Sequence, residues 1–401
     1  MMKNRDIVIV GLQPWDIEIG SNCKNIATEF AKHNRVLYVN APIDRKTYIR
    51  DKEKPNVKKR IDIINGAENL VEIAPNLWNL YPRSIIHSIN WVPFTGLFSI
   101  FNKSNNRKFA QDIKAAMQRL GFKDIILFND SDMFRSYFLN EMLKPDLSIY
   151  YSRDNLMVHK YWYKHGHILE PKLMSRNALV VANSEHLART AAQYNRNSFN
   201  VGQGCDISVF DSTKEYAVPE DLAQLPRPII GYIGAVLGHR LDIPMIREIA
   251  RLRPDWSLVF VGNLDADFKN SDLHSFPNIH FLGLKEEKSL PNYLQHFDVA
   301  FNPQSINDYT VANYPRKIDE YLALGKPTVA TDTATMSIFR DVVYLGSSAE
   351  EYIQLIERAI TEDSPEKRQQ RIACAASHTW DQSVKAIYEA IYKVRPDLQP
   401  K

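Results

Sequence analysis

Short apolar runs alternate with amphipathic segments along most of this chain. Near the N-terminus, the apolar run DIVIV at 6–10 is followed by a helical pattern over 21–33 and a second apolar run over 35–40. An apolar strand, a helix and a second apolar strand form the βαβ unit of a parallel sheet. The chain is therefore expected to open with an α/β domain.

The same alternation continues through the first half of the chain. Further strands are expected over 124–129, 147–151 and 178–183, and helices near 106–120, 132–142, 167–176 and 185–193. Residues 211–227 are polar and contain Pro219 and Pro226, as is typical of a linker between domains. We therefore expect a Rossmann-like first domain at 1–210 and a linker at 211–227.

A second series of strands and helices follows the expected linker. Its strands are expected over 229–233, 257–261, 279–282, 299–302 and 328–330, and its helices over 243–251, 290–296 and 315–324. In a last helix, over 381–392, apolar residues recur at helical spacing: Val384, Ile387, Tyr388 and Ile391. This pattern predicts a second Rossmann-like domain at 228–377 and a helix, about 378–394, that packs back on the first domain.

Composition narrows the class of protein. The 401 residues, with 44% hydrophobic and 24% charged positions, suffice for two domains with cores. The 50 basic and 47 acidic groups leave a charge of +3, which does not indicate a nucleic-acid partner. The three cysteines are far apart and form no CxxC pair, which argues against a disulfide framework. With no secretory apolar region near the N-terminus, a cytoplasmic protein is expected.

An uncharged run at 84–102 has two interpretations. Pro93 and Gly96 interrupt it, so it is not expected to span a membrane. Basic residues are concentrated upstream of it: Arg45, Lys46, Arg50, Lys52, Lys54, Lys58, Lys59 and Arg60. The run and the basic cluster form either a patch that binds an anionic membrane surface, with the protein peripheral at its inner face, or a buried segment beside a solvated loop.

The stretch 314–331, YPRKIDEYLALGKPTVAT, carries the strongest chemical signal. Pro315 suits the start of a helix, where free backbone N–H groups favour an anion. Lys317 can hold phosphate while Glu320, three residues on and on the same face, accepts two neighbouring hydroxyls. A phosphate beside a diol describes a nucleotide sugar. The alternative is an ordinary capped helix with a solvated Lys/Glu pair.

A second candidate site follows the strand at 229–233, in the sequence GYIGAVLGHRLD. Small residues such as Gly234 allow the backbone to approach a ligand. Arg240 lies one loop beyond the strand end, where a diphosphate clamp is expected. The alternative is a surface arginine paired with Asp242.

These segments occur in a specific order: GYIG, HR, PDWSLVFVG, FLG, Asp298 and PRKIDEYLALGKPTVAT. Over about 228–345 this order resembles the C-terminal domain of GT-B glycosyltransferases of the GT4 type. The resemblance implies a GT-B fold, in which two Rossmann-like, doubly wound α/β domains face a central cleft. It also implies retaining transfer of a sugar from a nucleotide diphosphate donor to a carbohydrate or lipid-linked acceptor in surface glycan synthesis, without a metal or other cofactor.

The resemblance also assigns roles to residues of the donor site. Arg240 and Lys317 would bind the donor diphosphate and stabilise the leaving group, and Glu320 would bind the ribose. The other expected donor contacts are Gly234, Gly283 and Leu284, the last two near the base, and Gly20 and Ser21 from the first domain. The chain departs from the family at Ala312, where a carboxylate is usual, and at Met245, where a lysine is common. Donor-sugar contacts would then fall to Asn313 or its neighbours.

Three residues of the first domain are candidates for the acceptor side. Asp154 follows an expected strand, so it either orients or deprotonates an acceptor hydroxyl or caps the strand end. Trp15 and Asp16 lie in the first loop after a strand, where they either contact donor or acceptor or stabilise the loop.

Two other functional classes were compared with glycosyl transfer. A dinucleotide-dependent oxidoreductase needs G-x-G-x-x-G after its first strand, and Gly11 is instead followed by LQPWDIEIG, which argues against this class. A catalytically inactive nucleotide-sugar binding or scaffold protein remains an alternative, because Ala312 replaces the usual carboxylate.

Overall fold

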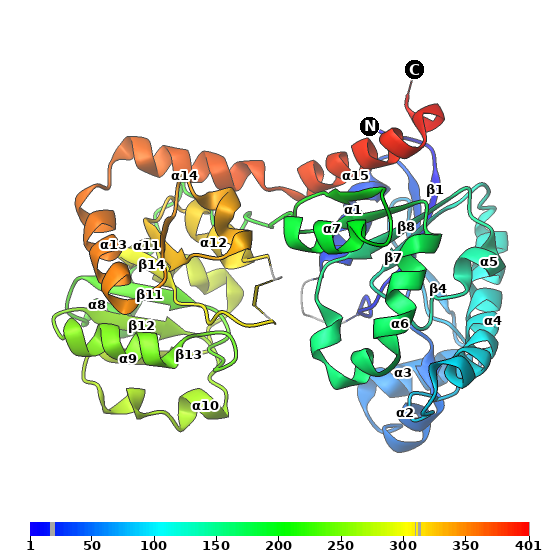
Figure 1. Cartoon of the computed structure of the whole chain (residues 1–401), viewed down its shortest axis with the longest axis horizontal. Coiled ribbons are helices and arrows are strands. Elements are labelled where there is room, and N and C mark those ends of the chain that lie inside the picture. Colours follow the sequence, from blue (N-terminus) through cyan, green and yellow to red (C-terminus); the bar gives the residue numbers. More distant parts are fainter. Residues whose placement is uncertain (17–20, 309, 312–313, 401) are drawn as a thin grey trace. The chain divides into compact units, whose positions relative to one another are not determined.

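The computed structural model describes residues 1–16, 21–308, 310–311 and 314–400 (Figure 1). The chain divides into two compact units, one made of Met1–Gly202 with Trp380–Lys401 and the other of Gln203–Thr379. Residues 211–227, predicted as a linker, lie in the second unit. There the backbone N–H of Tyr216 donates to the side chain of Gln295 at 2.7 Å.

The first unit is built on an eight-stranded sheet. Its order is β10 (Ser198–Asn200), β9 (Leu179–Ala182), β8 (Leu147–Ser152), β7 (Ile126–Asp130), β1 (Asp6–Val10), β2 (Arg35–Val39), β5 (Leu77–Leu80) and β4 (Leu70–Ala74). Neighbouring strands run parallel except β4, which pairs with β5 in the antiparallel sense. The carboxyl ends of the parallel strands therefore share one edge, where ligands bind in doubly wound sheets.

Helices cover both faces of this sheet. On one face, Ile7 and Ile9 of β1 pack in a core with α1 (Asn22–Ala31) and α15 (Trp380–Val394). On the other, Val8 and Val10 pack against α4 (Thr95–Leu120). The remaining elements are α2 (Arg45–Arg50), α3 (Pro55–Ile64), α5 (Leu139–Leu143), α6 (Lys160–Arg176), α7 (Glu185–Ala192) and a small sheet of β3 (Ile43–Asp44) and β6 (Ile85–Ile86).

Three predicted helices of the first unit are wrong in extent, and the one at 167–176 begins at Lys160 instead. The predicted helix 106–120 begins at Thr95 instead, because the asparagines that make its first half look like a loop are buried and bonded to backbone. Asn102 donates to the carbonyl of Phe134 at 2.7 Å and Asn105 to that of His87 at 2.9 Å. The predicted helix 132–142 begins only at Leu139, because the Asp132 carboxylate accepts backbone N–H groups in a turn.

The second unit is built on a parallel sheet of six strands. Its order is β13 (Ile279–Gly283), β12 (Ser257–Val261), β11 (Ile229–Ile233), β14 (Val299–Asn302), β15 (Thr328–Thr331) and β16 (Tyr344–Gly346). In chain order this is 3-2-1-4-5-6, the doubly wound arrangement, with the reversal of direction between β11 and β14. The predicted α/β class with two Rossmann-like domains is confirmed.

The helices of the second unit form a layer on each face of its sheet (Figure 1). One layer contains α9 (Ile243–Leu252) and α13 (Ala349–Thr361). The other contains α11 (Leu290–His296), α12 (Arg316–Ala323) and α14 (Pro365–Ser377). The short α8 (Glu220–Ala223) and α10 (Ala266–Lys269) complete the unit. Strand β11 is thus buried on both faces, with its carboxyl end at the reversal point.

Candidate functional site

Three glycines form the carboxyl edge of the second sheet. Gly234, Gly262 and Gly283 end β11, β12 and β13 with φ of 142°, 153° and 72°, which non-glycine residues rarely adopt. The N–H of Gly234 donates to Val261 and that of Gly262 to Gly283, each at 2.9 Å. A Cβ on Gly262 would lie 1.9 Å from the Gly234 carbonyl oxygen. A side chain at Gly262 would therefore collide with the neighbouring backbone, so this part of the edge requires glycine.

Lys317, in the first turn of α12, reaches this glycine edge. Its Nζ donates to the hydroxyl of Tyr232 at 2.8 Å and lies 4.7 Å from the centre of that ring. A Cβ on Gly234 would lie 2.8 Å from the same nitrogen, so the glycine leaves room for the ammonium group. A half-buried cation, a helix N-terminus and the glycine edge thus converge where anions bind in this type of sheet.

Glu320 lies one turn further along α12, and its contact with ribose hydroxyls stays a prediction. Its carboxylate accepts from Arg316 Nε at 3.1 Å, and 14% of its side chain is exposed. Burial raises the pKa of Glu320, against the opposing charges of Arg316 and Lys317. Lys317 bonds Tyr232 and Glu320 pairs with Arg316, so the structure does not show the simple solvated Lys/Glu pair.

The opposite side of α12 is anchored by a buried carboxylate. Asp319 accepts from the Tyr314 hydroxyl and from Nδ1 of His378, each at 2.7 Å. Burial raises the pKa of Asp319, while both partners act in the other direction. The His378 carbonyl in turn accepts the N–H of Cys205 at 2.9 Å. These contacts fix the position of the helix that carries Lys317 and Glu320.

Arg240 lies in the loop between β11 and α9, beside the chain that follows β14. Its carbonyl accepts the N–H of Ser305 at 2.9 Å, and the N–H of Asp242 donates to Pro303 at 2.9 Å. The Asp242 side chain caps α9 by accepting from the N–H of Met245 at 2.9 Å. Two segments at the reversal point are thereby held together. At the far end of the edge, Leu284 follows Gly283 with 69% of its surface exposed.

Trp15 and Asp16 of the first unit both make contacts that stabilise their loop. The N–H of Trp15 donates to Asn40 at 2.8 Å. The Asp16 carboxylate accepts from Lys59 Nζ at 2.9 Å and from the Tyr81 hydroxyl at 3.2 Å. Although burial opposes it, the hydrogen bond and charge of Lys59 keep the pKa of Asp16 below its ordinary value. Contact with a substrate stays a prediction for both residues.

Asp154 lies just beyond the carboxyl end of β8, as expected for an acceptor-side residue. Its carboxylate accepts from Arg153 at 3.0 Å and is 44% exposed. Arg153 also donates to Asp130 at 2.7 Å, and both of those side chains are almost fully buried. A buried arginine thus links the exposed carboxylate to the sheet.

Of the remaining predicted residues, the structure describes Ser21 but not Gly20 or Asn313. Ser21 is buried and immediately precedes α1. Gly20 and Asn313 lie outside the described residues, as does Ala312. Among the described residues, no group of three or more His, Cys, Asp and Glu side chains is placed to hold a metal ion.

Sequence reasoning missed three residues at or near the glycine edge. Tyr232 and Gly262 lie in the quoted strings GYIG and VFVG, but their roles depend on contacts with distant residues. Arg316 precedes Lys317, and its i, i+4 spacing to Glu320 is a signal for the observed pair.

Exposed apolar side chains cluster at 91–101 in the first unit. Trp91, Phe94 and Ile100 expose 74%, 72% and 68% of their surfaces, so this part of the run is not the buried segment considered above. No helix within the described part of the chain has both the length and the apolar character to cross a membrane. An exposed apolar patch of this kind marks an interaction surface.

One family model matches most of the second unit. Residues 227–362 match the model of the family described as glycosyl transferases group 1. The putative teichuronic acid biosynthesis glycosyltransferase TuaH of Bacillus subtilis (strain 168) is 28% identical over 190 residues, or 45% of this chain and 47% of that protein. The aligned region thus spans about half the length of this curated relative. The predicted resemblance to this group of glycosyltransferases is confirmed.

Solved structures share the fold across the chain. Sucrose-phosphate synthase from Thermosynechococcus elongatus is 14% identical with a TM-score of 0.64, covering 98% of this chain and 100% of that one. HepE of Anabaena, in complex with UDP, is 14% identical with a TM-score of 0.64, covering 97% and 100%. A trehalose 6-phosphate synthase from Burkholderia multivorans is 10% identical with a TM-score of 0.63, covering 99% of this chain and 100% of that one. At these identities the likeness establishes the GT-B fold alone.

Proposed function

Because residues 227–362 belong to the glycosyl transferases group 1 family, we propose that the chain is a retaining glycosyltransferase of the GT4 type. It moves a sugar from a nucleotide diphosphate donor to a carbohydrate or lipid-linked acceptor in surface glycan synthesis. The observation that carries this proposal is the Lys317 ammonium group, held by Tyr232 beside the glycine edge at the reversal point of the second sheet.

The donor lies along the glycine edge. Its diphosphate contacts the backbone near Gly234, the Lys317 ammonium and Arg240, while the ribose hydroxyls bind Glu320. The exposed side chain of Leu284, next to Gly283, gives the base an apolar surface. HepE of Anabaena has been solved in complex with UDP and with UDP-glucose, which supports a nucleotide sugar in this fold.

In the reaction, the bond between the anomeric carbon and the phosphate oxygen breaks, and a bond to an acceptor oxygen forms on the same face of the sugar. The proton of the acceptor hydroxyl passes to the departing phosphate oxygen. Charge builds up on the departing nucleoside diphosphate. Lys317, Arg240 and the N-terminus of α12 stabilise that charge, so the reaction needs no metal ion or other cofactor. Fixed cations of this kind act most strongly where water is excluded.

Asp154 orients the acceptor hydroxyl. Its carboxylate is exposed at the carboxyl edge of the first sheet and held by Arg153, which is itself anchored on Asp130. A carboxylate held by an anchored arginine in this way is suited to positioning a hydroxyl group.

The exposed apolar surface at 91–101 contacts an anionic membrane. Ile49, which is 63% exposed, extends this surface, and the basic residues Arg45 and Lys46 stand on the same helix. Apolar residues flanked by cations bind the interface of a membrane that carries negative lipids.

A donor panel tests the proposed activity. Uridine, guanosine, adenosine and deoxythymidine diphosphate sugars are screened for an increase in melting temperature, since a bound ligand stabilises the folded state. The stabilising donor is then expected to be hydrolysed slowly, releasing a sugar with the anomeric configuration of the donor. A donor that binds but is never turned over, with or without candidate acceptors, supports the inactive binding protein instead.

A further inference from the structure

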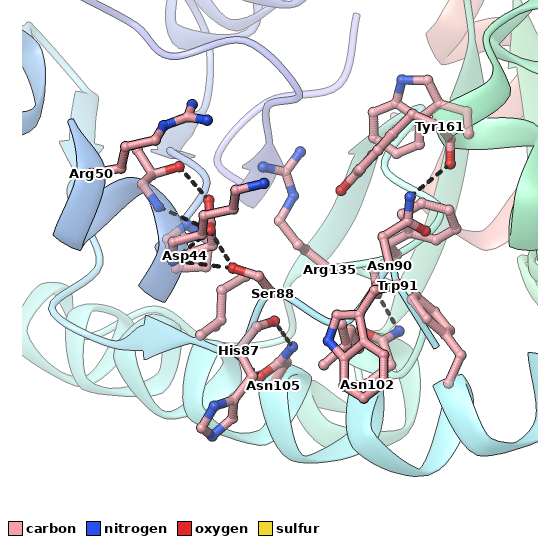
Figure 2. Close-up of a pocket in the computed structure, with 18 residues that line it drawn as sticks. Asp44, Arg50, His87, Ser88, Asn90, Trp91, Asn102, Asn105, Arg135 and Tyr161 are labelled. Carbon is pink, nitrogen blue, oxygen red and sulfur yellow. Dashed lines mark hydrogen bonds between the residues drawn. The ribbon is translucent and has the colours of Figure 1, made fainter. Parts of the chain in front are cut away.

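The first unit contains a cavity that the residues predicted from the sequence do not use. It has a volume of about 430 Å³ and lies between α2, the segment 86–91, α4 and the loop that follows β7. Figure 2 shows Asp44 and Ser88 on one side, Asn90 and Tyr161 on the other, and the Arg135 guanidinium group between them. Its volume is within the range of small-molecule sites.

Cations predominate in the lining of this cavity. Lys46, Arg50 and Arg135 line it, whereas Asp44 is its one acidic lining residue. The Asp44 carboxylate is occupied, since it accepts from Ser88, Thr47 and two N–H groups at the start of α2. Arg135 bonds Asp132 through Nε at 2.6 Å, and its two terminal nitrogens have no hydrogen-bond partner in the described part of the chain. The cavity therefore presents cationic donors suited to an anion.

An open apolar groove of about 480 Å³ adjoins the cavity. The two share Lys46, Ser88 and Trp91 among their lining residues, and so they lie against one another. The groove adds Ile49 and Phe101, and beyond it the exposed apolar surface continues along the start of α4. A polar, cationic cavity thus lies beside an apolar groove at the surface.

We propose that the cavity and the groove form a single site for a lipid phosphate, with the phosphate near Arg135 and Lys46 and the hydrocarbon chain along the groove. A flat protein partner would leave the cavity empty, whereas this amphipathic ligand matches the charge of the cavity and the apolar lining of the groove. If the chain is the proposed glycosyltransferase, its acceptor is carried on a lipid phosphate.

Farnesyl phosphate, used below its aggregation concentration, is the probe for this site. Calorimetric titration is expected to give one site per chain, with binding at least about tenfold tighter than that of farnesol or inorganic phosphate. Equal affinity for inorganic phosphate would mean a free-phosphate site and overturn the proposal, as would the absence of binding.

Four variants separate the two halves of the site. Arg135→Gln and Lys46→Gln are each expected to weaken farnesyl phosphate binding about tenfold or more and to leave farnesol unchanged. Ile49→Ser is expected to weaken both ligands. Arg135→Gln removes the ion-pair partner of the buried Asp132, and this can disturb folding. Because Lys46 is exposed, Lys46→Gln tests the same half of the site without that complication. The matched control for the two glutamine substitutions is Arg107→Gln, at an exposed position of α4. If Arg107→Gln weakens farnesyl phosphate binding as much as Arg135→Gln does, the assignment of the site is contradicted.

Binding to vesicles and to nucleotides separates the lipid phosphate site from the proposed membrane surface and from the proposed donor site. Adsorption to phosphatidylglycerol vesicles that decreases as salt is added supports the membrane surface, and no adsorption at low salt refutes it. Retained nucleotide diphosphate binding without farnesyl phosphate binding refutes the lipid site and leaves the donor site intact. Farnesyl phosphate binding by a chain that neither binds nor turns over any donor refutes the proposed function and leaves the lipid site intact.

Discussion

Replacing Lys317 by alanine is expected to weaken the binding of a nucleoside diphosphate by about ten- to a hundredfold and to leave nucleoside binding nearly unchanged. A charge-assisted contact contributes about 1.5–3 kcal/mol, which corresponds to this range. The effect is expected to be specific to phosphate because the Lys317 Nζ, bonded to Tyr232 at 2.8 Å, lies at the glycine edge where we propose that the diphosphate binds. The measurement is calorimetric titration of both ligands with both proteins.

The control for this substitution is Lys269→Ala. Lys269 is an exposed lysine in the last turn of α10, in the same unit. Lys269→Ala removes one positive charge from the same unit at a different place. It is therefore expected to leave the affinities for the nucleoside and for the nucleoside diphosphate nearly unchanged. If Lys317→Ala weakens the nucleoside and the nucleoside diphosphate equally, Lys317 does not contact the phosphates.

Replacing Gly262 by alanine is expected to destabilise the second unit by about 3 kcal/mol or more. The added Cβ would lie 1.9 Å from the Gly234 carbonyl oxygen, and the residue has a φ of 153° that alanine rarely adopts. Overpacking and backbone strain each cost about 1–3 kcal/mol. Because the clashing atom belongs to the backbone, no side-chain rotation relieves it. Chemical denaturation, followed through the transition of the second unit, measures this loss.

Gly283→Ala is the matched comparison. Gly283 also has a positive φ, 72°, but its added Cβ would have no atom within 4 Å. Only the backbone preference remains, and it costs about 1–2 kcal/mol. Equal destabilisation by the two substitutions would show that the close approach of β11 and β12 does not constrain Gly262.

The fold of the second unit was largely predictable because its elements carry local signals. Strands 229–233, 257–261 and 299–302 and helix 290–296 are observed with the predicted bounds, since each is an apolar or amphipathic run with clear ends. The first half of α4 was missed for the opposite reason. Its asparagines look like loop residues, and only their bonds to a distant loop make them helical.

The candidate site was predictable in its residue types and less so in its contacts. Lys317 and Glu320 were expected to act side by side on α12, yet each has another partner in the structure. The partner Tyr232 is distant in sequence, so no local spacing indicates it. The cavity around Arg135 was also missed, because its lining comes from five separate segments of the first unit.

The donor site in the second unit is tested most directly by amide hydrogen exchange with the nucleoside diphosphate that the donor panel selects. Protection is expected in peptides that contain Gly234, Gly283 and the start of α12. Peptides from α10 in the same unit are expected to exchange at an unchanged rate. A saturating nucleoside diphosphate that protects other parts of the second unit, and leaves the glycine edge and α12 unprotected, would contradict the account.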